Sequence, residues 1–200
     1  MRWLCALLAA ALAVSAYGRE RTLMVLGDSL STGYGFERER GWVSLLAQRL
    51  ERTHPAYRVV NASISGETTH GARSRLPAAL ERHDPDVVIV ELGGNDGLRG
   101  IPLAETRRHL EAILDMLREG DAVTLLVGMR LPPNYGPRYT EAFEAMYREL
   151  ARDAGVTLVP FLLEGVATDA QLMQPDGIHP QAQAQPRILA NVWPHLEPLL

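Results

Sequence analysis

Lysine is absent from this sequence of 200 residues, and all 20 of its basic residues are arginine. Chemistry that needs a lysine amine is therefore excluded, including P-loop, Schiff-base and Ser–Lys mechanisms. The single cysteine, Cys5, allows no internal disulfide and no cysteine-rich metal site. The 24 acidic residues bring the formal net charge to −4. This balance argues against a nucleic-acid-binding protein, which needs a basic surface.

Aromatic residues make up 6% of the chain and charged residues 22%, while hydrophobic residues reach 46%. Such a composition excludes a disordered chain and an integral membrane protein. The length suits one compact domain with a sizeable core. The chain contains no internal repeat, low-complexity tract or linker-like stretch.

Residues 1–18 have the pattern of a secretory signal peptide. Arg2 precedes an apolar run that ends at Ala13, and small residues follow it. The run is short for a bilayer core of about 30 Å. We expect cleavage after Gly18 or Ala16 and a periplasmic or secreted protein without stable membrane insertion. An uncleaved N-terminal anchor is the alternative. Cleavage would remove the cysteine, which suits an oxidising compartment.

Residues 19–200 are predicted to form one domain in which strands and helices alternate. Apolar runs predict strands over 22–27, 57–61, 86–92, 122–127 and 156–160. Helical spacing predicts helices over 41–52, 70–82, 104–118, 140–154 and 181–197. Pro77, Pro186 and Pro194 are weak points in these helices. The alternation predicts an α/β domain whose parallel sheet is covered on both faces, with ligands bound at the carboxyl ends of the strands.

Four polar segments stand at predicted strand ends or late in the chain: 27–31 (GDSLS), 61–68 (NASISGET), 93–97 (GGNDG) and 176–180 (DGIHP). They could bring together a serine, an acid and a histidine for nucleophilic catalysis. Taken singly, each has another interpretation as a helix cap, a turn or a surface loop. Asp176 and His179 could also be metal ligands. No second histidine or cysteine lies near them in the sequence, so we expect no metal.

Together these segments resemble the SGNH (GDSL) hydrolases, and among them the bacterial thioesterases, lysophospholipases and arylesterases. The matching blocks run in order over 27–31, 60–66, 91–100, 130–136 and 176–180. The resemblance implies a three-layer αβα sandwich around a flavodoxin-like sheet of five parallel strands, with no cofactor. It also implies that Ser29 is the nucleophile, that Asp176 and His179 complete the triad, and that Gly66 and Asn95 donate to the oxyanion.

The chemistry of each residue agrees with these roles. A serine hydroxyl needs a base to take its proton, and His179 has an acid three positions before it, so one tight loop can present both. Ser29 opens the segment after a strand, where free backbone N–H groups can face an oxyanion. Gly66 has no Cβ to obstruct its N–H, and Asn95 offers a neutral amide donor. We therefore expect hydrolysis of an ester or thioester through an acyl-enzyme.

Several neighbours of the predicted catalytic residues are expected to have structural roles or depart from the family pattern. Asp28 is expected to serve the turn before Ser29, and Asp96 to organise its own loop. Glu67 departs from the family pattern, in which a shorter Asp is expected. Thr69-His70 departs as well, since a Ser is expected there. These departures concern contacts beside Gly66 and leave the mechanism unchanged.

The acyl group is expected to contact apolar residues of two loops: Leu98, Ile101, Leu131 and Tyr135. Gly97 and Gly100 would let the first loop close over an acyl chain. The alternative is that these side chains only pack the loops. The expected partner is a small-molecule acyl ester or thioester, and the expected state is a monomer. A carbohydrate O-deacetylase on the same fold and a non-enzymatic flavodoxin-like binding module are the competing functions.

The signal-peptide interpretation predicts the mass of the exported protein. Cleavage by signal peptidase should leave Arg19 or Tyr17 as the first residue. Intact-mass spectrometry of protein recovered from the periplasm or medium checks this. A mass that includes Met1 would contradict the prediction.

Overall fold

The computed structural model describes residues 19–200, so the predicted signal peptide lies outside the described residues. One sheet contains five parallel strands: β1 (Arg21–Gly27), β2 (Tyr57–Asn61), β3 (Val87–Glu91), β4 (Val123–Val127) and β5 (Thr157–Val159). The long helices are α2 (Trp42–Thr53), α3 (Thr69–His83), α5 (Leu103–Glu119), α6 (Pro137–Ala154) and α7 (Gln185–Leu196). Two short helices, α1 (Ser29–Thr32) and α4 (Gly94–Leu98), follow β1 and β3.

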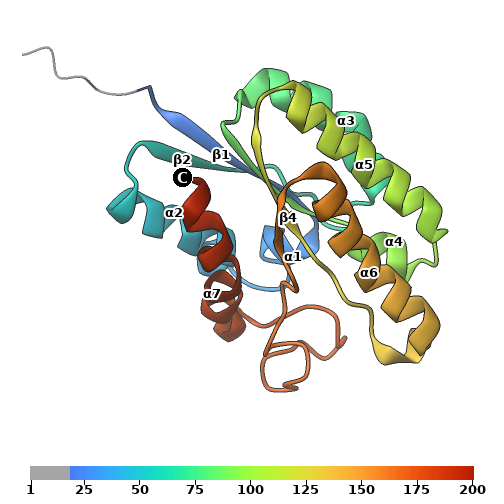
Figure 1. Ribbon diagram of the computed structural model, residues 1–200. Helices are drawn as coiled ribbons and strands as arrows, with labels where there is room; N and C mark the ends of the chain where they lie inside the picture. Colours follow the sequence, from blue (N-terminus) through green and yellow to red (C-terminus); the bar gives the residue numbers. More distant parts are fainter. Residues whose placement is uncertain (1–18) are drawn as a thin grey trace, which may run out of the picture.

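Helices cover both faces of the sheet and make three layers. Helices α3, α5 and α6 lie on one face, and α2 and α7 lie on the other (Figure 1). Because both faces are covered, the central strands are continuous apolar runs: 23–26 in β1 and 87–90 in β3 are buried throughout. The predicted αβα sandwich is confirmed.

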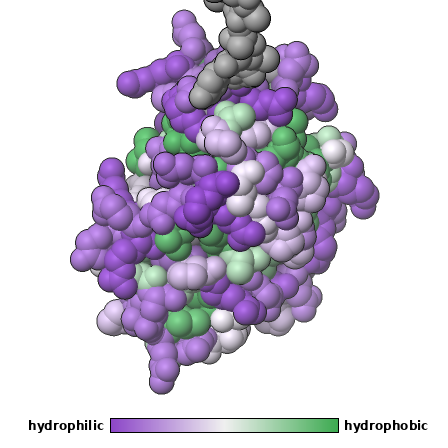
Figure 2. Space-filling view, turned by 90° about the vertical axis from the view of Figure 1, so that its left-hand side faces the viewer, coloured by the Kyte–Doolittle hydropathy of each residue, from purple (hydrophilic) through white to green (hydrophobic). Residues whose placement is uncertain are grey.

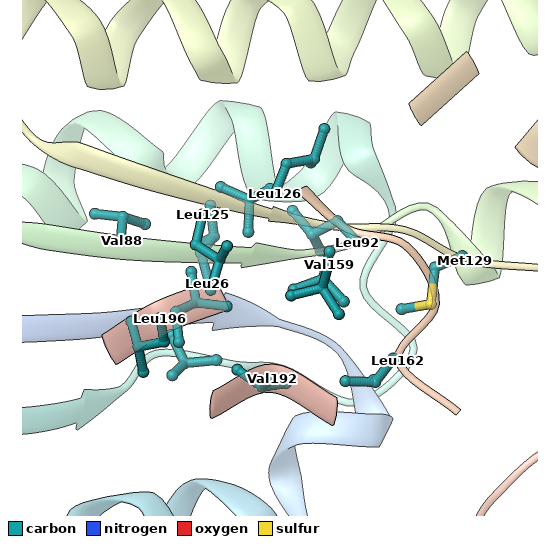
Figure 3. Packing of buried hydrophobic residues seen from close by; sticks show 14 of the residues in the cluster. Leu26, Val88, Leu92, Leu125, Leu126, Met129, Val159, Leu162, Val192 and Leu196 are labelled. Atoms are coloured by element: carbon teal, nitrogen blue, oxygen red, sulfur yellow. The ribbon is translucent and has the colours of Figure 1, made fainter. Parts of the chain in front are cut away.

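Side chains from the sheet and from α7 meet in one core. Figure 3 shows Val192 and Leu196 of α7 facing Leu26 of β1 and Val159 of β5. Burying such side chains is worth about 1.5–3 kcal/mol each, which is the main force that holds the helical layers to the sheet. The surface seen in Figure 2 is mostly hydrophilic, with small separate hydrophobic areas. Within the described part of the chain, no helix is long and apolar enough to cross a membrane.

The prolines interrupt the helices less than expected. Helix α3 continues through Pro77, and α7 has Pro186 in its first turn and Pro194 in its interior. A first-turn proline loses nothing, because its missing N–H would have no helical partner there. Residues 93–97 do not form a simple turn. Gly93 has φ 104° and the next five residues form α4. This short helix had no apolar period by which it could be predicted.

The strand order β2-β1-β3-β4-β5 places the point at which the order of the strands reverses between β1 and β3. In open parallel sheets this switch point leaves a crevice at the carboxyl ends of the two strands. Gly27, the last residue of β1, pairs with Glu91, the last residue of β3. The segments that begin at Asp28 and Leu92 therefore leave the sheet side by side.

Candidate active site

Ser29, His179 and Asp176 form a continuous hydrogen-bonded series. Nε2 of His179 lies 2.8 Å from Oγ of Ser29, and Nδ1 lies 2.7 Å from Oδ2 of Asp176. Ser29 is the first residue of α1, directly after the turn that ends β1. The acid and the imidazole come from one loop, 150 residues further along the chain than the serine. The geometry matches the order nucleophile, base and orienting acid.

The loop itself holds Asp176 in its ionised form. Partial burial would raise the pKa of Asp176, but hydrogen bonds from the His179 and Ile178 backbone N–H groups and from the His179 ring outweigh it. The pKa of Asp176 is therefore lowered to about 2. An ionised acid at this position selects the imidazole tautomer that leaves Nε2 free to accept the serine proton.

Three groups near the serine turn each have a donor hydrogen without a partner among the described residues. The backbone N–H groups of Ser29 and Gly66 donate to no acceptor in the described residues. The side-chain amide of Asn95, in α4, donates one hydrogen to Oδ2 of Asp28 at 2.9 Å. Its second hydrogen is left for a ligand. An oxyanion formed on a carbonyl held at Ser29 would need such donors.

Asp28 serves the turn before Ser29, as expected, and also contacts a second segment of the site. Its Oδ1 caps α1 by accepting from the Leu30 N–H at 3.0 Å, while Oδ2 fixes the amide of Asn95. The side chain is 2% exposed. Burial raises the pKa of Asp28 to about 6, although the hydrogen bonds from Leu30 and Asn95 favour the carboxylate. One carboxyl group thus orients both the turn that carries Ser29 and the side-chain amide of Asn95.

Glu91 is the functional-site residue that the sequence interpretation left without a role. It ends β3 with no exposed surface, and its Oε2 accepts from Oγ of Ser31 at 2.6 Å and from the Asp28 N–H at 3.2 Å. Its Oε1 has no partner among the described residues. Burial, and then the charge of Asp28, raise the pKa of Glu91 well above its usual range. The signal was present in the sequence as one acid at the end of an otherwise apolar strand.

Gly27 is the residue that makes room for this buried carboxyl. A Cβ at position 27 would stand 2.7 Å from Oε2 of Glu91 and 2.9 Å from the hydroxyl oxygens of Ser31 and Ser63. Contacts under 3 Å are repulsive, so a larger residue would push Glu91 or the serine turn out of place.

The loop that carries Gly66 is held at three points. Gly66 has φ 78°, and its carbonyl accepts from the Arg99 guanidinium at 2.9 Å. Glu67 pairs with Arg75 of α3. The backbone N–H of Thr69 donates to Asp96 at 2.9 Å, and its hydroxyl donates to the same carboxylate. Glu67 and Thr69 therefore have partners of their own, and the carboxylate of Asp96 holds the start of α3 and not its own loop.

The four residues predicted to contact the acyl group lie in different surroundings. Leu131 is 8% exposed and packs beneath Gly97. Tyr135 donates its hydroxyl to the Leu98 carbonyl at 2.9 Å, which joins the two apolar loops. Ile101 lines a separate cavity between α3 and α5 with His70 and His109. Packing of the loops thus accounts for Leu131, and contact with the acyl group remains a prediction for all four.

No group of three His, Cys, Asp or Glu side chains in residues 19–200 is placed to hold a metal ion. Two further residues near His179 had no assigned role: Tyr34, whose ring lies against the imidazole, and Gln174, which hydrogen-bonds to the His179 loop. The Tyr34 contact joins segments far apart in the chain, whereas Gln174 and His179 are five residues apart.

The chain belongs to the GDSL-like Lipase/Acylhydrolase family, whose model matches residues 25–185. It is therefore a hydrolase of the esterase type. It is 52% identical over 180 residues to Esterase TesA of Pseudomonas aeruginosa, covering 90% of each chain. It is 47% identical to Thioesterase 1/protease 1/lysophospholipase L1 of Escherichia coli K12, covering 90% of this chain and 85% of that one. The crystal structure of TesA superimposes with a TM-score of 0.88, at 52% identity, over 90% of this chain and 100% of that one.

Burial of Glu91 predicts a pH-dependent cost in stability. The pKa of this carboxyl is raised in the folded state, so the unfolded chain loses its proton at lower pH than the folded protein does. Stability of the natural protein should fall as pH rises through that interval. Glu91→Gln removes this effect and keeps an acceptor for Ser31.

The melting temperature of Glu91→Gln, relative to the natural protein, should therefore rise from about pH 5 to about pH 9. Differential scanning calorimetry across this range measures it. Glu51→Gln, at an exposed position of α2, serves as the matched control and should show no such trend. A constant difference for Glu91→Gln would contradict a carboxyl that stays protonated.

Proposed function

We propose that this protein is an exported serine esterase that hydrolyses carboxylic esters and thioesters through an acyl-enzyme on Ser29. One observation supports this most strongly: the Ser29–His179–Asp176 series lies beside the backbone N–H groups of Ser29 and Gly66 and the second amide hydrogen of Asn95, which have no partner among the described residues. Nucleophile, base and oxyanion donors are the parts that acyl transfer requires.

In acylation, Nε2 of His179 takes the proton of Ser29 as Oγ attacks the carbonyl carbon of the substrate. The carbonyl oxygen becomes an oxyanion and accepts from the backbone N–H groups of Ser29 and Gly66 and from the amide of Asn95. The tetrahedral intermediate collapses when His179 returns the proton to the leaving alcohol or thiol. In deacylation, His179 activates a water in the same way and the acid product leaves.

The proposed substrates include more than simple carboxylic esters. The similar proteins are named esterase and thioesterase/lysophospholipase, and these names support acyl esters, thioesters and lysophospholipids as substrate classes of one site. Arylesterase activity is part of the same proposal. The apolar loops of Leu98 and Tyr135, joined by a hydrogen bond, are the proposed contact surface for the acyl chain.

The cellular setting is also a proposal. The charged start and apolar run of residues 1–18 support export to the periplasm or medium, and the proposed state there is a monomer. The proposed partner is a small acyl substrate, and the net charge of −4 argues against a nucleic acid.

Replacing the proposed nucleophile should abolish turnover. Ser29→Ala removes the attacking oxygen, so hydrolysis of p-nitrophenyl esters and covalent labelling by a fluorophosphonate probe should both disappear. Ser74→Ala, at an exposed serine of α3, is the control and should keep both. Full activity of the Ser29→Ala variant would refute the assignment.

Replacing Asn95 should slow the chemistry and leave binding nearly unchanged. Asn95→Ala removes a donor that acts on the transition state, and loss of one such donor costs about 2.7–4 kcal/mol, or about 100- to 1,000-fold in kcat. Steady-state kinetics give kcat and KM separately. A change confined to KM would argue against the oxyanion role.

A further inference from the structure

The ring of Tyr34 lies against the imidazole of His179. The two ring centres are 4.4 Å apart and the planes are tilted by 35°. Tyr34 follows α1 in a bend whose neighbours, Gly33 and Gly35, both have positive φ. The contact joins the segment after the nucleophile to the base, so it belongs to the site and not to the core.

Gln174 fastens the two loops together. Its side-chain amide donates to the Tyr34 carbonyl at 2.8 Å and to the Pro180 carbonyl at 3.0 Å. Its backbone N–H donates to the His179 carbonyl at 2.7 Å. Gly35 packs directly on this amide, with no room for a Cβ. Because both loops are tied to one residue, the position of Tyr34 relative to the imidazole is well defined.

Tyr34 nevertheless keeps half of its surface in water. The side chain is 50% exposed, and its hydroxyl bonds to no group in the described residues. Of the four large apolar side chains exposed in residues 19–200, three belong to site loops: Tyr34, Ile64 and Ile178. The fourth, Val123, begins β4 at the opposite end of the sheet. The apolar exposure is thus concentrated around the candidate triad.

The chemistry of acylation indicates that the leaving group of the substrate would contact this surface. His179 must protonate the departing atom, so the leaving group lies within about 3 Å of the imidazole at that moment. The ring of Tyr34, which packs on that imidazole, is then the apolar surface next to the leaving group. Rings in offset or tilted contact gain about 0.5–1.5 kcal/mol beyond burial, a factor of about 2 to 12 in rate.

We propose that Tyr34 is a specificity-determining residue whose exposed ring contacts the leaving group and favours esters of aromatic alcohols. The inference rests on the proposed function, because it needs His179 to act as the acid toward the leaving group. The acyl group and the leaving group would then be selected by separate surfaces, the acyl group by the apolar loops and the leaving group by Tyr34.

Two butyrate esters test the proposal, because phenyl butyrate and methyl butyrate form the same butyryl-enzyme. Their kcat/KM values report acylation, where the leaving group is present. Tyr34→Ala should lower kcat/KM for phenyl butyrate by about 2- to 12-fold more than for methyl butyrate. Tyr34→Phe should keep the natural ratio, since the hydroxyl has no partner. Tyr34→Leu, which keeps apolar bulk without the ring, should fall between the two.

A purely structural role would give a different result. If Tyr34 only held His179 in place, both esters would lose rate equally, and hydrolysis of the isolated butyryl-enzyme would slow as well. Either outcome overturns the proposal. Val123→Ala, at the exposed apolar residue far from the site, is the control and should leave the ratio unchanged. Melting temperatures verify that each variant is folded.

Fluorophosphonate labelling separates this inference from the proposed function. Labelling of Ser29 and hydrolysis of both esters by the natural protein, with an unchanged ester ratio in Tyr34→Ala, would overturn only the role of Tyr34. A natural protein that is not labelled and hydrolyses neither ester would overturn both proposals.

Discussion

The parallel pairing of β1 with β3 is the constraint on which the site depends. Its register joins Gly27 to Glu91, so both strands end together at the switch point of the sheet. The chain then leaves the same edge twice, once into α1 with Ser29 and once into α4 with Asn95. A shift of one residue would turn the side chains of one strand to the opposite faces and separate Ser29 from Asn95. Close packing of these strands between the helical layers opposes that shift, because each buried side chain fits its own neighbours.

A pair of buried acids connects this register to the chemistry. Glu91 accepts from the serine turn, and Asp28 accepts from Asn95, so the strand ends, the turn and the oxyanion amide form one hydrogen-bonded unit. Burying carboxyl groups is unfavourable, and the raised pKa values of both express that cost. In the proposed mechanism the same contacts preorganise the donors, which would need no rearrangement when charge develops on the substrate. The buried Asp28 and Glu91 carboxyl groups therefore lower the stability of the fold while they fix the positions of Ser29 and Asn95.

The base is positioned by a different means. Asp176 and His179 share a tight loop that supplies its own hydrogen bonds, so their relation was predictable from a spacing of three residues. Tyr34 and Gln174 were not predictable, because the hydrogen bond between them spans 140 residues and neither stands in a polar segment with an evident role. Glu91 was visible as an acid in an apolar strand, but only its burial and its contact with Ser31 show what it does.

The sequence by itself determined the elements with a strong apolar period and the parallel α/β class, and its polar blocks indicated the candidate triad and oxyanion residues. These rest on local patterns: buried runs such as 87–90, helical spacing, and short polar blocks after strands. Tertiary structure alone decided the strand order, the register at Gly27, the helix at 94–98, the sharing of Asp28 between turn and amide, and the placing of Tyr34 on His179. The physical reason is that these features arise from contacts between segments distant in the chain, where packing and burial outweigh local preference.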